Sequence, residues 1–142
     1  MSTSRGRSRG KQPDGLQKAD VQLFEKVSEQ LKKLRDDFGT LAKPKPDAPL
    51  NVLKVGFVNE KLAEANRLLK GPHKPFEKFE QFDTDALPSN SDVQLVLSQY
   101  LACLEGWRSA NVVKRGYDWV WDLEDEDVEA SSPSRFAAEG IE

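Results

Sequence analysis

The sequence contains few of the residues on which most catalytic and metal sites depend. Its 142 residues include one cysteine, Cys103, and one histidine, His73, on separate segments. A single cysteine excludes an intramolecular disulfide and a cysteine-rich zinc site, and a lone histidine argues against a nucleophilic dyad or a di-iron bundle. The chain also lacks a Walker pattern, a glycine-rich phosphate loop and a GxSxG elbow. We therefore expect no catalytic residues, no metal and no cofactor, and we predict that the protein is not an enzyme.

Long apolar runs are absent as well. The uncharged run from Val93 to Leu104 has 12 residues, whereas a helix that crosses a bilayer needs about 20. The first 20 residues contain no apolar segment of the kind found in secretory signal peptides. We expect no membrane partner and a non-secreted, intracellular protein, located in the cytoplasm or in the interior of a virus or its host cell.

Charge is distributed unevenly along the chain. The formal net charge is -3, but residues 1–46 carry 11 basic and 6 acidic side chains, while residues 117–142 carry 1 and 9. Residues 1–13 contain no apolar side chain after Met1 and are expected to be a disordered basic arm. The candidate nucleic-acid-binding residues of this arm are Arg5, Arg7, Arg9 and Lys11. A tail that only improves solubility is the alternative. Residues 124–142 are expected to form a disordered acidic tail.

Two stretches with helical spacing precede the uncharged run. The first helix is expected over residues 14–42, with an apolar seam at steps of three and four residues formed by Phe24, Val27, Leu31, Leu34, Phe38 and Leu41. This seam packs either on another helix of the same chain or on a second copy. After the proline-rich residues 43–49, a second helix is expected from about residue 47 to 70, with a stripe formed by Val55, Val58, Leu62, Ala65 and Leu69.

Several details of the second helix need explanation. Leu50, Leu53 and Phe57 are interpreted as widening its buried stripe. Gly56 inside the helix costs about 1 kcal/mol relative to alanine, which a close crossing of another helix would explain. The Gly71-Pro72 pair ends the helix.

The uncharged run predicts a third, central helix over residues 92–115. Its apolar residues again recur at helical spacing: Val93, Val96, Leu97, Tyr100, Leu101, Leu104 and Trp107. Ser91 is expected to cap it, Lys114 and Arg115 to lie in its last turn, and Gly116 to end it.

Two aromatic segments flank this helix. Phe76, Phe79 and Phe82 recur at every third residue, which suits tight turns that close the edge of the core, or a ridge for a partner peptide. In residues 117–123, alternation places Tyr117, Trp119, Trp121 and Leu123 on one face of an extended segment. This segment is either a strap that buries its rings on the bundle or a docking segment for a partner. The candidate partner-binding residues are Phe76, Phe79, Phe82, Trp119 and Trp121.

These patterns predict an all-α fold. We expect a three- to four-helix bundle domain over residues 14–123 with an extended aromatic C-terminal strap, flanked by disordered tails. The leading functional hypothesis is a non-enzymatic binding or assembly module, with a protein partner or self-association, and with nucleic acid as a further candidate partner of the basic arm. The alternative is a small helical-bundle enzyme or ligand-binding protein with a pocket near Phe76, Phe79 and Tyr100.

Overall fold

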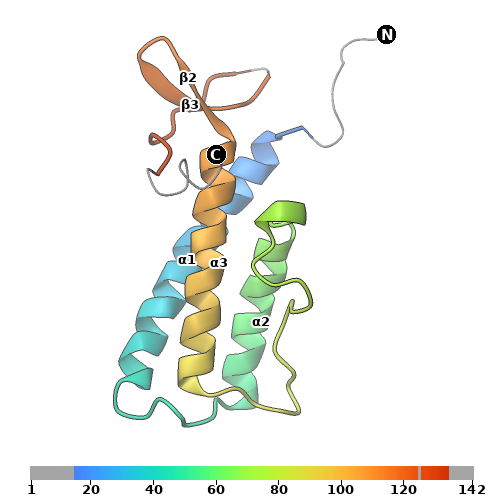
Figure 1. The fold of residues 1–142 in the computed structure, drawn as a ribbon, viewed down its shortest axis with the longest axis vertical. Helices are drawn as coiled ribbons and strands as arrows, with labels where there is room; N and C mark the ends of the chain where they lie inside the picture. Colours follow the sequence, from blue (N-terminus) through green and yellow to red (C-terminus); the bar gives the residue numbers. More distant parts are fainter. Residues whose placement is uncertain (1–14, 125, 135–142) are drawn as a thin grey trace.

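The computed structural model describes residues 15–124 and 126–134. Three helices make up most of this part: α1 (Lys18–Ala42), α2 (Val52–Asn66) and α3 (Asn90–Ala110). A single 3-10 turn, η1 (Gly71–His73), follows α2, and two short strands, β2 (Val112–Arg115) and β3 (Asp118–Trp121), follow α3. The helices lie side by side along the long axis (Figure 1). The mostly helical prediction is confirmed, but the class is not strictly all-α, and the described residues form no fourth long helix.

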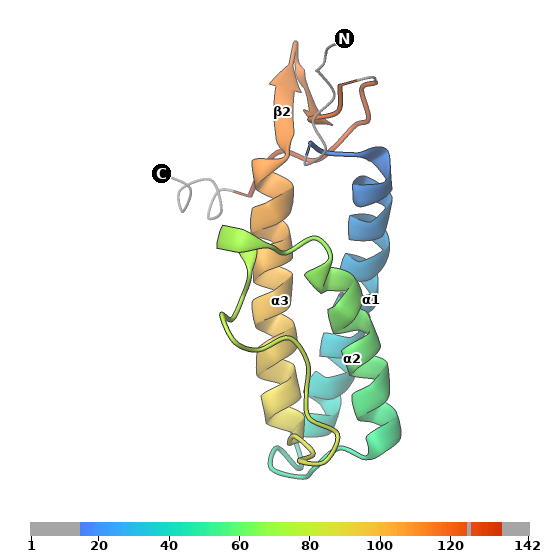
Figure 2. The ribbon, with the colours of Figure 1, turned by 90° about the vertical axis from the view of Figure 1, so that its right-hand side faces the viewer.

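The two ends of the bundle differ in composition. At one end, called the hairpin end below, the start of α1 and the end of α3 meet β2, β3 and residues 126–134 (Figure 1). At the other, called the connector end, residues 43–51 join α1 to α2, and residues 83–89 lead into α3 (Figures 1 and 2). The two ends of the bundle are therefore covered by different segments of the chain.

The starts of α1 and α2 are set by local capping and lie later than the spacing alone predicts. α1 begins after Gln17, whose backbone N–H donates to Asp20 Oδ2 at 3.0 Å, while the Asp20 N–H donates to the Gln17 carbonyl at 2.9 Å; Asp14, the expected cap, lies outside the described residues. The side chain of Asn51 accepts a hydrogen bond from the backbone N–H of Lys54 at 2.8 Å, so α2 begins at Val52 and the expected start near residue 47 is wrong.

α3 also differs from the prediction at both ends. Ser89, not Ser91, accepts from the backbone N–H of Asp92 and caps the helix. The helix ends at Ala110, so Lys114 and Arg115 lie in β2 and not in a last helical turn. Two successive valines, residues 112 and 113, favour a strand here.

The segment expected as a strap is one half of a β-hairpin. β2 and β3 pair antiparallel, with Val112 opposite Trp121 and Arg115 opposite Asp118. Gly116, expected to end α3, instead forms the turn with a φ of 66°, a left-handed conformation that glycine adopts without strain. The backbone of α3 is thereby continued into a two-stranded sheet.

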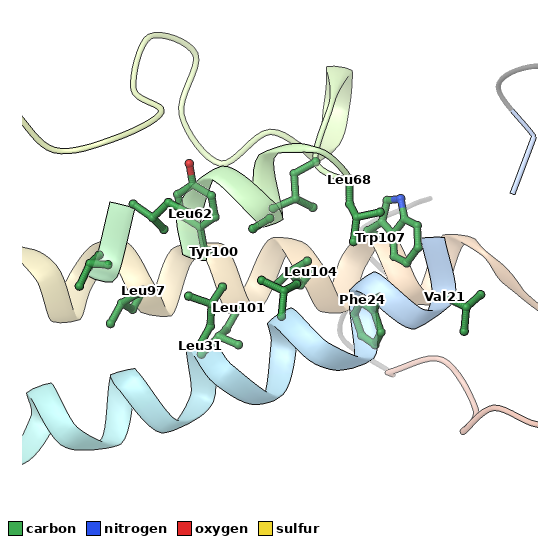
Figure 3. Packing of buried hydrophobic residues seen from close by; sticks show 14 of the residues in the cluster. Val21, Phe24, Leu31, Leu62, Leu68, Leu97, Tyr100, Leu101, Leu104 and Trp107 are labelled. Atoms are coloured by element: carbon green, nitrogen blue, oxygen red, sulfur yellow. The ribbon is translucent and has the colours of Figure 1, made fainter. Parts of the chain in front are cut away.

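The core confirms the helical spacing of the three helices (Figure 3). Val27, Leu31 and Phe38 of the α1 seam are buried, as are Leu97 and Leu104 of α3. The fully buried residues of α2 are Val55, Val58, Leu62 and Ala65. The α1 seam therefore packs within its own chain, although Leu34 is only partly buried and Leu41 is exposed. Complete burial of one such aliphatic side chain contributes about 1.5–3 kcal/mol.

Aromatic rings close the hairpin end. Trp121 lies 5.4 Å from Phe24 and 5.8 Å from Trp107 between ring centroids, and Phe24 stacks on Trp107 at 5.5 Å. The expected alternation fails, because Val120 and Trp121 are both buried while Tyr117 is 98% exposed. The strap interpretation is thus correct for Trp121 and wrong for Tyr117.

A further extended segment, residues 126–134, explains why the adjacent residues Val120 and Trp121 of β3 are both buried. The N–H of Trp121 donates to the carbonyl of Val128 at 2.9 Å, and the N–H of Ala130 donates to the carbonyl of Trp119 at 3.0 Å. The Arg108 guanidinium donates to the carbonyls of Ser131 and Ser132. Residues 126–134 are therefore held against the hairpin, and the expected disorder from residue 124 onward is wrong for them. Residues 1–13 and 135–142 lie outside the described part.

Candidate interaction surfaces

The predicted nucleic-acid-binding residues, Arg5, Arg7, Arg9 and Lys11, lie outside the described part of the chain. The structure does describe the end of the bundle to which the arm is attached. There, Lys18 Nζ lies 3.4 Å from Glu126 Oε2, and Arg115 pairs with Asp122 and Asp127 at 3.3 and 2.8 Å. Lys18, near the start of the described chain, therefore lies beside the acidic segment that follows β3.

The phenylalanine loop, residues 74–88, runs along α2 and α3 (Figure 2). Phe79 makes edge contacts with Phe76 at 5.6 Å and with Phe82 at 5.0 Å, and Phe76 lies 6.5 Å from Tyr100. All three phenylalanines are half-buried against the core. Tight turns occur at η1, ahead of these rings, and at residues 83–86, after them, but not at the rings themselves. The rings close the edge of the core and keep part of their surface accessible, so a partner-binding role stays a prediction.

Two asparagines of α2 hold this loop in place. Asn59 Oδ1 accepts from the N–H of Phe82 at 2.8 Å, and its Nδ2 donates to the carbonyl of the same residue at 2.9 Å. Asn66 Nδ2 donates to the carbonyl of Glu80 at 3.0 Å, and its Oδ1 accepts from the Tyr100 hydroxyl at 2.8 Å. The loop is thus attached to α2 through its backbone, independently of its side-chain sequence.

The region expected to hold a pocket near Phe76, Phe79 and Tyr100 is occupied by these rings and this hydrogen-bond network. The adjacent hollow, of about 640 Å³, opens to solvent and is lined mainly by polar residues: Ala63, Asn66, Lys74, Glu77, Lys78, Glu80 and Gln81. Lys74 Nζ is already bonded to Glu80 Oε2 at 3.0 Å. The hollow lacks the enclosed apolar walls of a typical ligand site.

Burial disfavours the ionised form of the two potential nucleophiles of α3, Tyr100 and Cys103. Burial raises the pKa of the Tyr100 hydroxyl, although its hydrogen bond to Asn66 acts in the opposite direction. Burial also raises the pKa of the Cys103 thiol, and the thiolate is the reactive form. Within residues 15–124 and 126–134, no group of three His, Cys, Asp or Glu side chains could hold a metal ion. No helix of this described part is long and apolar enough to cross a membrane.

A second hollow of about 380 Å³ lies between α1 and α3 and is also open. Leu101 and Leu104 form its apolar floor, and Lys32, Arg35 and Glu105 are among its lining residues. Burial alone would raise the pKa of Glu105, but the hydrogen bonds and charge of Arg108 hold it below its usual value. Glu105 is thus engaged with Arg108, at 2.7 Å.

Three of the large apolar side chains that the helices expose lie together at the start of α2. Val52 is 60% exposed, Leu53 66% and Phe57 54%. Between them, a Cβ atom added to Gly56 would meet no heavy atom within 4 Å. We call these four residues, Val52, Leu53, Gly56 and Phe57, the open face of α2. The interpretation of Leu53 and Phe57 as buried is wrong, and no other helix of the described chain crosses closely at Gly56.

The sequence does carry a signal for this exposure. The buried stripe of α2 is complete without Leu53 and Phe57, because Val55, Val58 and Leu62 already fill the side that faces the core. Leu53 and Phe57 share their side of the helix with Glu60, at steps of four and three residues. The charged residue marks that side as the solvent side.

Known proteins give no further guidance. No protein-family model matches the chain, and no curated protein or solved structure is significantly similar to it. We therefore infer function from the surfaces of this chain alone.

Proposed function

We propose that this protein is a non-enzymatic assembly module that binds a protein helix across the open face of α2. One observation carries the proposal: Leu53 and Phe57 are mostly exposed on consecutive turns, next to a glycine with open space above it. Single exposed apolar residues are normal on protein surfaces, whereas a contiguous group indicates an interaction site.

Gly56 favours a helix as the occupant. Packed helix axes lie about 8–10 Å apart, and the distance depends on the size of the side chains at the crossing. A glycine at the crossing leaves room for a large side chain of the partner. Glycine inside a helix costs about 1 kcal/mol relative to alanine, and no contact within the described chain offsets this cost. Docking of a partner helix would offset it.

The alternative, an enzyme or a ligand-binding protein, has less support. The space between α2 and α3 is taken by rings and hydrogen bonds, and the hollows beside it are open. The exposed apolar surface of α2, by contrast, has no role in the fold of the described residues. A binding module accounts for this surface, while a ligand pocket elsewhere would not.

The test uses the full chain with one substitution on the open face and one matched control. Phe57→Glu places a charge on the open face, and Leu95→Glu places the same charge at a 59% exposed leucine of α3. Both side chains are exposed, so we expect unchanged circular dichroism and a near-unchanged melting temperature for both. Quantitative cross-linking and pull-down from the native source should then show binding by the wild type and by Leu95→Glu, and its loss in Phe57→Glu. Equal binding by all three proteins would contradict the proposal.

Other predicted partner-binding residues offer less surface. Trp121 is only 2% exposed, and Trp119 is half-buried under residues 126–134. Phe76, Phe79 and Phe82 keep partial exposure, and a supporting role for them is tested by the same pull-down with alanine substitutions. Binding of nucleic acid by the basic arm remains a separate prediction.

A further inference from the structure

We infer that the helix received by the open face is α2 of a second copy of this chain. The two helices would lie antiparallel, related by a twofold axis that passes between Gly56 and Phe57. This inference rests on the proposed function, because it names the partner of the same surface. Three features of the described residues support it: complementary shape, complementary charge and the orientation of the surface.

The orientation comes from the helix geometry. The buried residues Val55, Val58 and Leu62 define the side of α2 that faces the core. The direction opposite to this side points away from the core. With about 3.6 residues per turn, Gly56 lies roughly 50° to one side of that outward direction and Phe57 roughly 50° to the other. The midpoint between them is thus the most outward line of the helix, which is where a second helix can approach without meeting α1 or α3.

The shape is complementary to itself. In an antiparallel pair with this axis, residue 56 of one copy is opposite residue 57 of the other, and residue 53 is opposite residue 60. The Phe57 ring of each copy then covers the open space at Gly56 of its partner, twice in one interface. Contacts that repeat in this way are the defining property of a twofold-symmetric interface. Each glycine thereby accommodates one ring.

The charge is complementary as well. The first turn of α2 contains no acidic residue, and it carries Lys54. Neither Lys54 nor Glu60 forms an ion pair within the described residues. The same axis brings Glu60 of each copy to the first turn of the other α2, where the helix dipole and Lys54 both favour an anion. Glu60 would thus supply the acidic group that this turn lacks.

The size of the contact sets the expected affinity. A pair of helices that meet over two or three turns buries less than the roughly 1,200 Å² typical of stable complexes. We therefore expect a dimer that forms only at high protein concentration and dissociates on dilution. Sedimentation velocity across a concentration series of the full chain measures this equilibrium directly.

The first pair of variants separates association from folding. Gly56→Leu fills the space for the partner's ring and also improves the helix propensity of α2. We expect its melting temperature at low concentration to rise and its dimerisation to weaken by about tenfold or more. Ala102→Leu, a similar addition at an exposed position of α3, should leave the dissociation constant unchanged. A variant that folds better and associates less well cannot be explained by misfolding.

The second pair tests the charges by complementation. In Lys54→Glu, residues 54 and 60 are both acidic, and in Glu60→Lys both are basic. Each variant alone should therefore dimerise several-fold less than the wild type, because like charges then meet between the copies. An equal mixture should recover dimers, because the two proteins then present opposite charges to each other. Recovery in the mixture is specific to a contact between copies.

Three results would overturn the inference. In the first, the wild-type chain stays monomeric throughout the concentration series. In the second, the dimer persists in both Gly56→Leu and Phe57→Glu. In the third, the mixture of Lys54→Glu and Glu60→Lys associates no better than either variant alone. The proposed function fails separately, if Phe57→Glu retains every bound protein that the wild type retains. A monomeric wild type that loses a captured protein on Phe57→Glu would refute the second copy and support a different helix as the partner.

Discussion

The two ends of the bundle differ in how far the adjoining segments cover the apolar side chains of the helices. At the hairpin end, Phe24, Trp107 and Trp121 pack on one another and are almost completely buried. At the connector end, Val52 and Leu53 remain mostly exposed, although the helix that carries them is well packed on its other side. The difference shows that exposure here is a property of the covering segments and not of the helices.

The covering segments explain the difference. At the hairpin end, the chain after α3 turns back twice, so that β3 and residues 126–134 cover the end of the core. At the connector end, residues 43–51 are tied to the start of α3 through backbone hydrogen bonds, such as those from Asn90 to Ala48 and from Leu50 to Pro88. Their proline and charged side chains point to solvent and cover none of the open face of α2.

The largest effect is expected from removal of the central ring at the hairpin end. Trp121→Ala deletes the ring that contacts both Phe24 and Trp107, and truncation of a buried tryptophan costs about 3–5 kcal/mol. The control, Tyr117→Ala, removes an almost fully exposed ring of the same hairpin and should change stability by less than about 0.5 kcal/mol. Urea denaturation measures both. Equal effects would mean that the hairpin end is not closed by this contact.

The fold was predictable to the extent that it follows from periodicity. Apolar spacings of three and four residues predict the three buried stripes and the central position of residues 93–104. The hairpin was not predictable in the same way, because residues 112–115 continue the apolar and basic pattern of a helix end. Only the pairing with β3, a contact between segments, decides between strand and helix there.

A smaller effect is expected in the middle of the bundle, between the two ends. Leu101 packs between α1 and α3 but borders the open hollow. Leu101→Ala should therefore cost about 2–3 kcal/mol, the lower part of the range for buried leucine, because water can fill part of the space. Leu95→Ala, an exposed leucine of the same helix, is the control and should be nearly neutral. Chemical denaturation measures the free energy of unfolding of both variants. If Leu101→Ala loses no more stability than Leu95→Ala, the α1–α3 contact contributes little to stability.

Substitution of Asn59 is expected to expose a second apolar surface, in the phenylalanine loop, in addition to the open face of α2. Asn59→Ala removes both hydrogen bonds that hold the backbone of Phe82, and unpaired, partly buried backbone groups cost about 1–2 kcal/mol. We expect faster hydrogen exchange at the Phe82 amide and greater exposure of Phe79. Asn59→Asp keeps the acceptor for the Phe82 N–H and should lose less. An unchanged exchange rate at Phe82 in the alanine variant would show that ring packing alone holds the loop.

The candidate surface was less predictable than the fold. Leu53 and Phe57 satisfy helical spacing almost as well as the buried residues do, and in the sequence only Glu60, on the same side of α2, separates the two sets. How much of that side the rest of the chain covers depends on the route of the connector, which the spacing does not give. Gly56 was the residue that pointed to a close helix crossing, and within the described chain no such crossing exists.

The smallest effect concerns the basic arm and the charges next to it. Arg5, Arg7, Arg9 and Lys11 predict weak, sequence-independent binding of RNA or DNA that falls steeply with salt. Lys18 lies 3.4 Å from Glu126, so acidic side chains lie near the start of the described chain, to which the arm is joined. They should compete with phosphate for it, over a distance limited to roughly 8 Å by screening at physiological ionic strength. Fluorescence anisotropy across a salt series measures the binding.

Deletion of residues 1–12 should abolish this binding, while Glu126→Gln combined with Glu129→Gln should strengthen it a few-fold. Substitutions are preferable to a truncation after Leu123, because a truncation would also remove the segment that covers β3 and would change charge and folding together. The matched control, Asp47→Asn with Asp85→Asn, removes the same charge from exposed positions at the connector end and should have less effect. If the deletion variant binds as well as the full chain, the arm only improves solubility. If the two double variants behave alike, overall charge and not the position of Glu126 beside Lys18 controls the interaction.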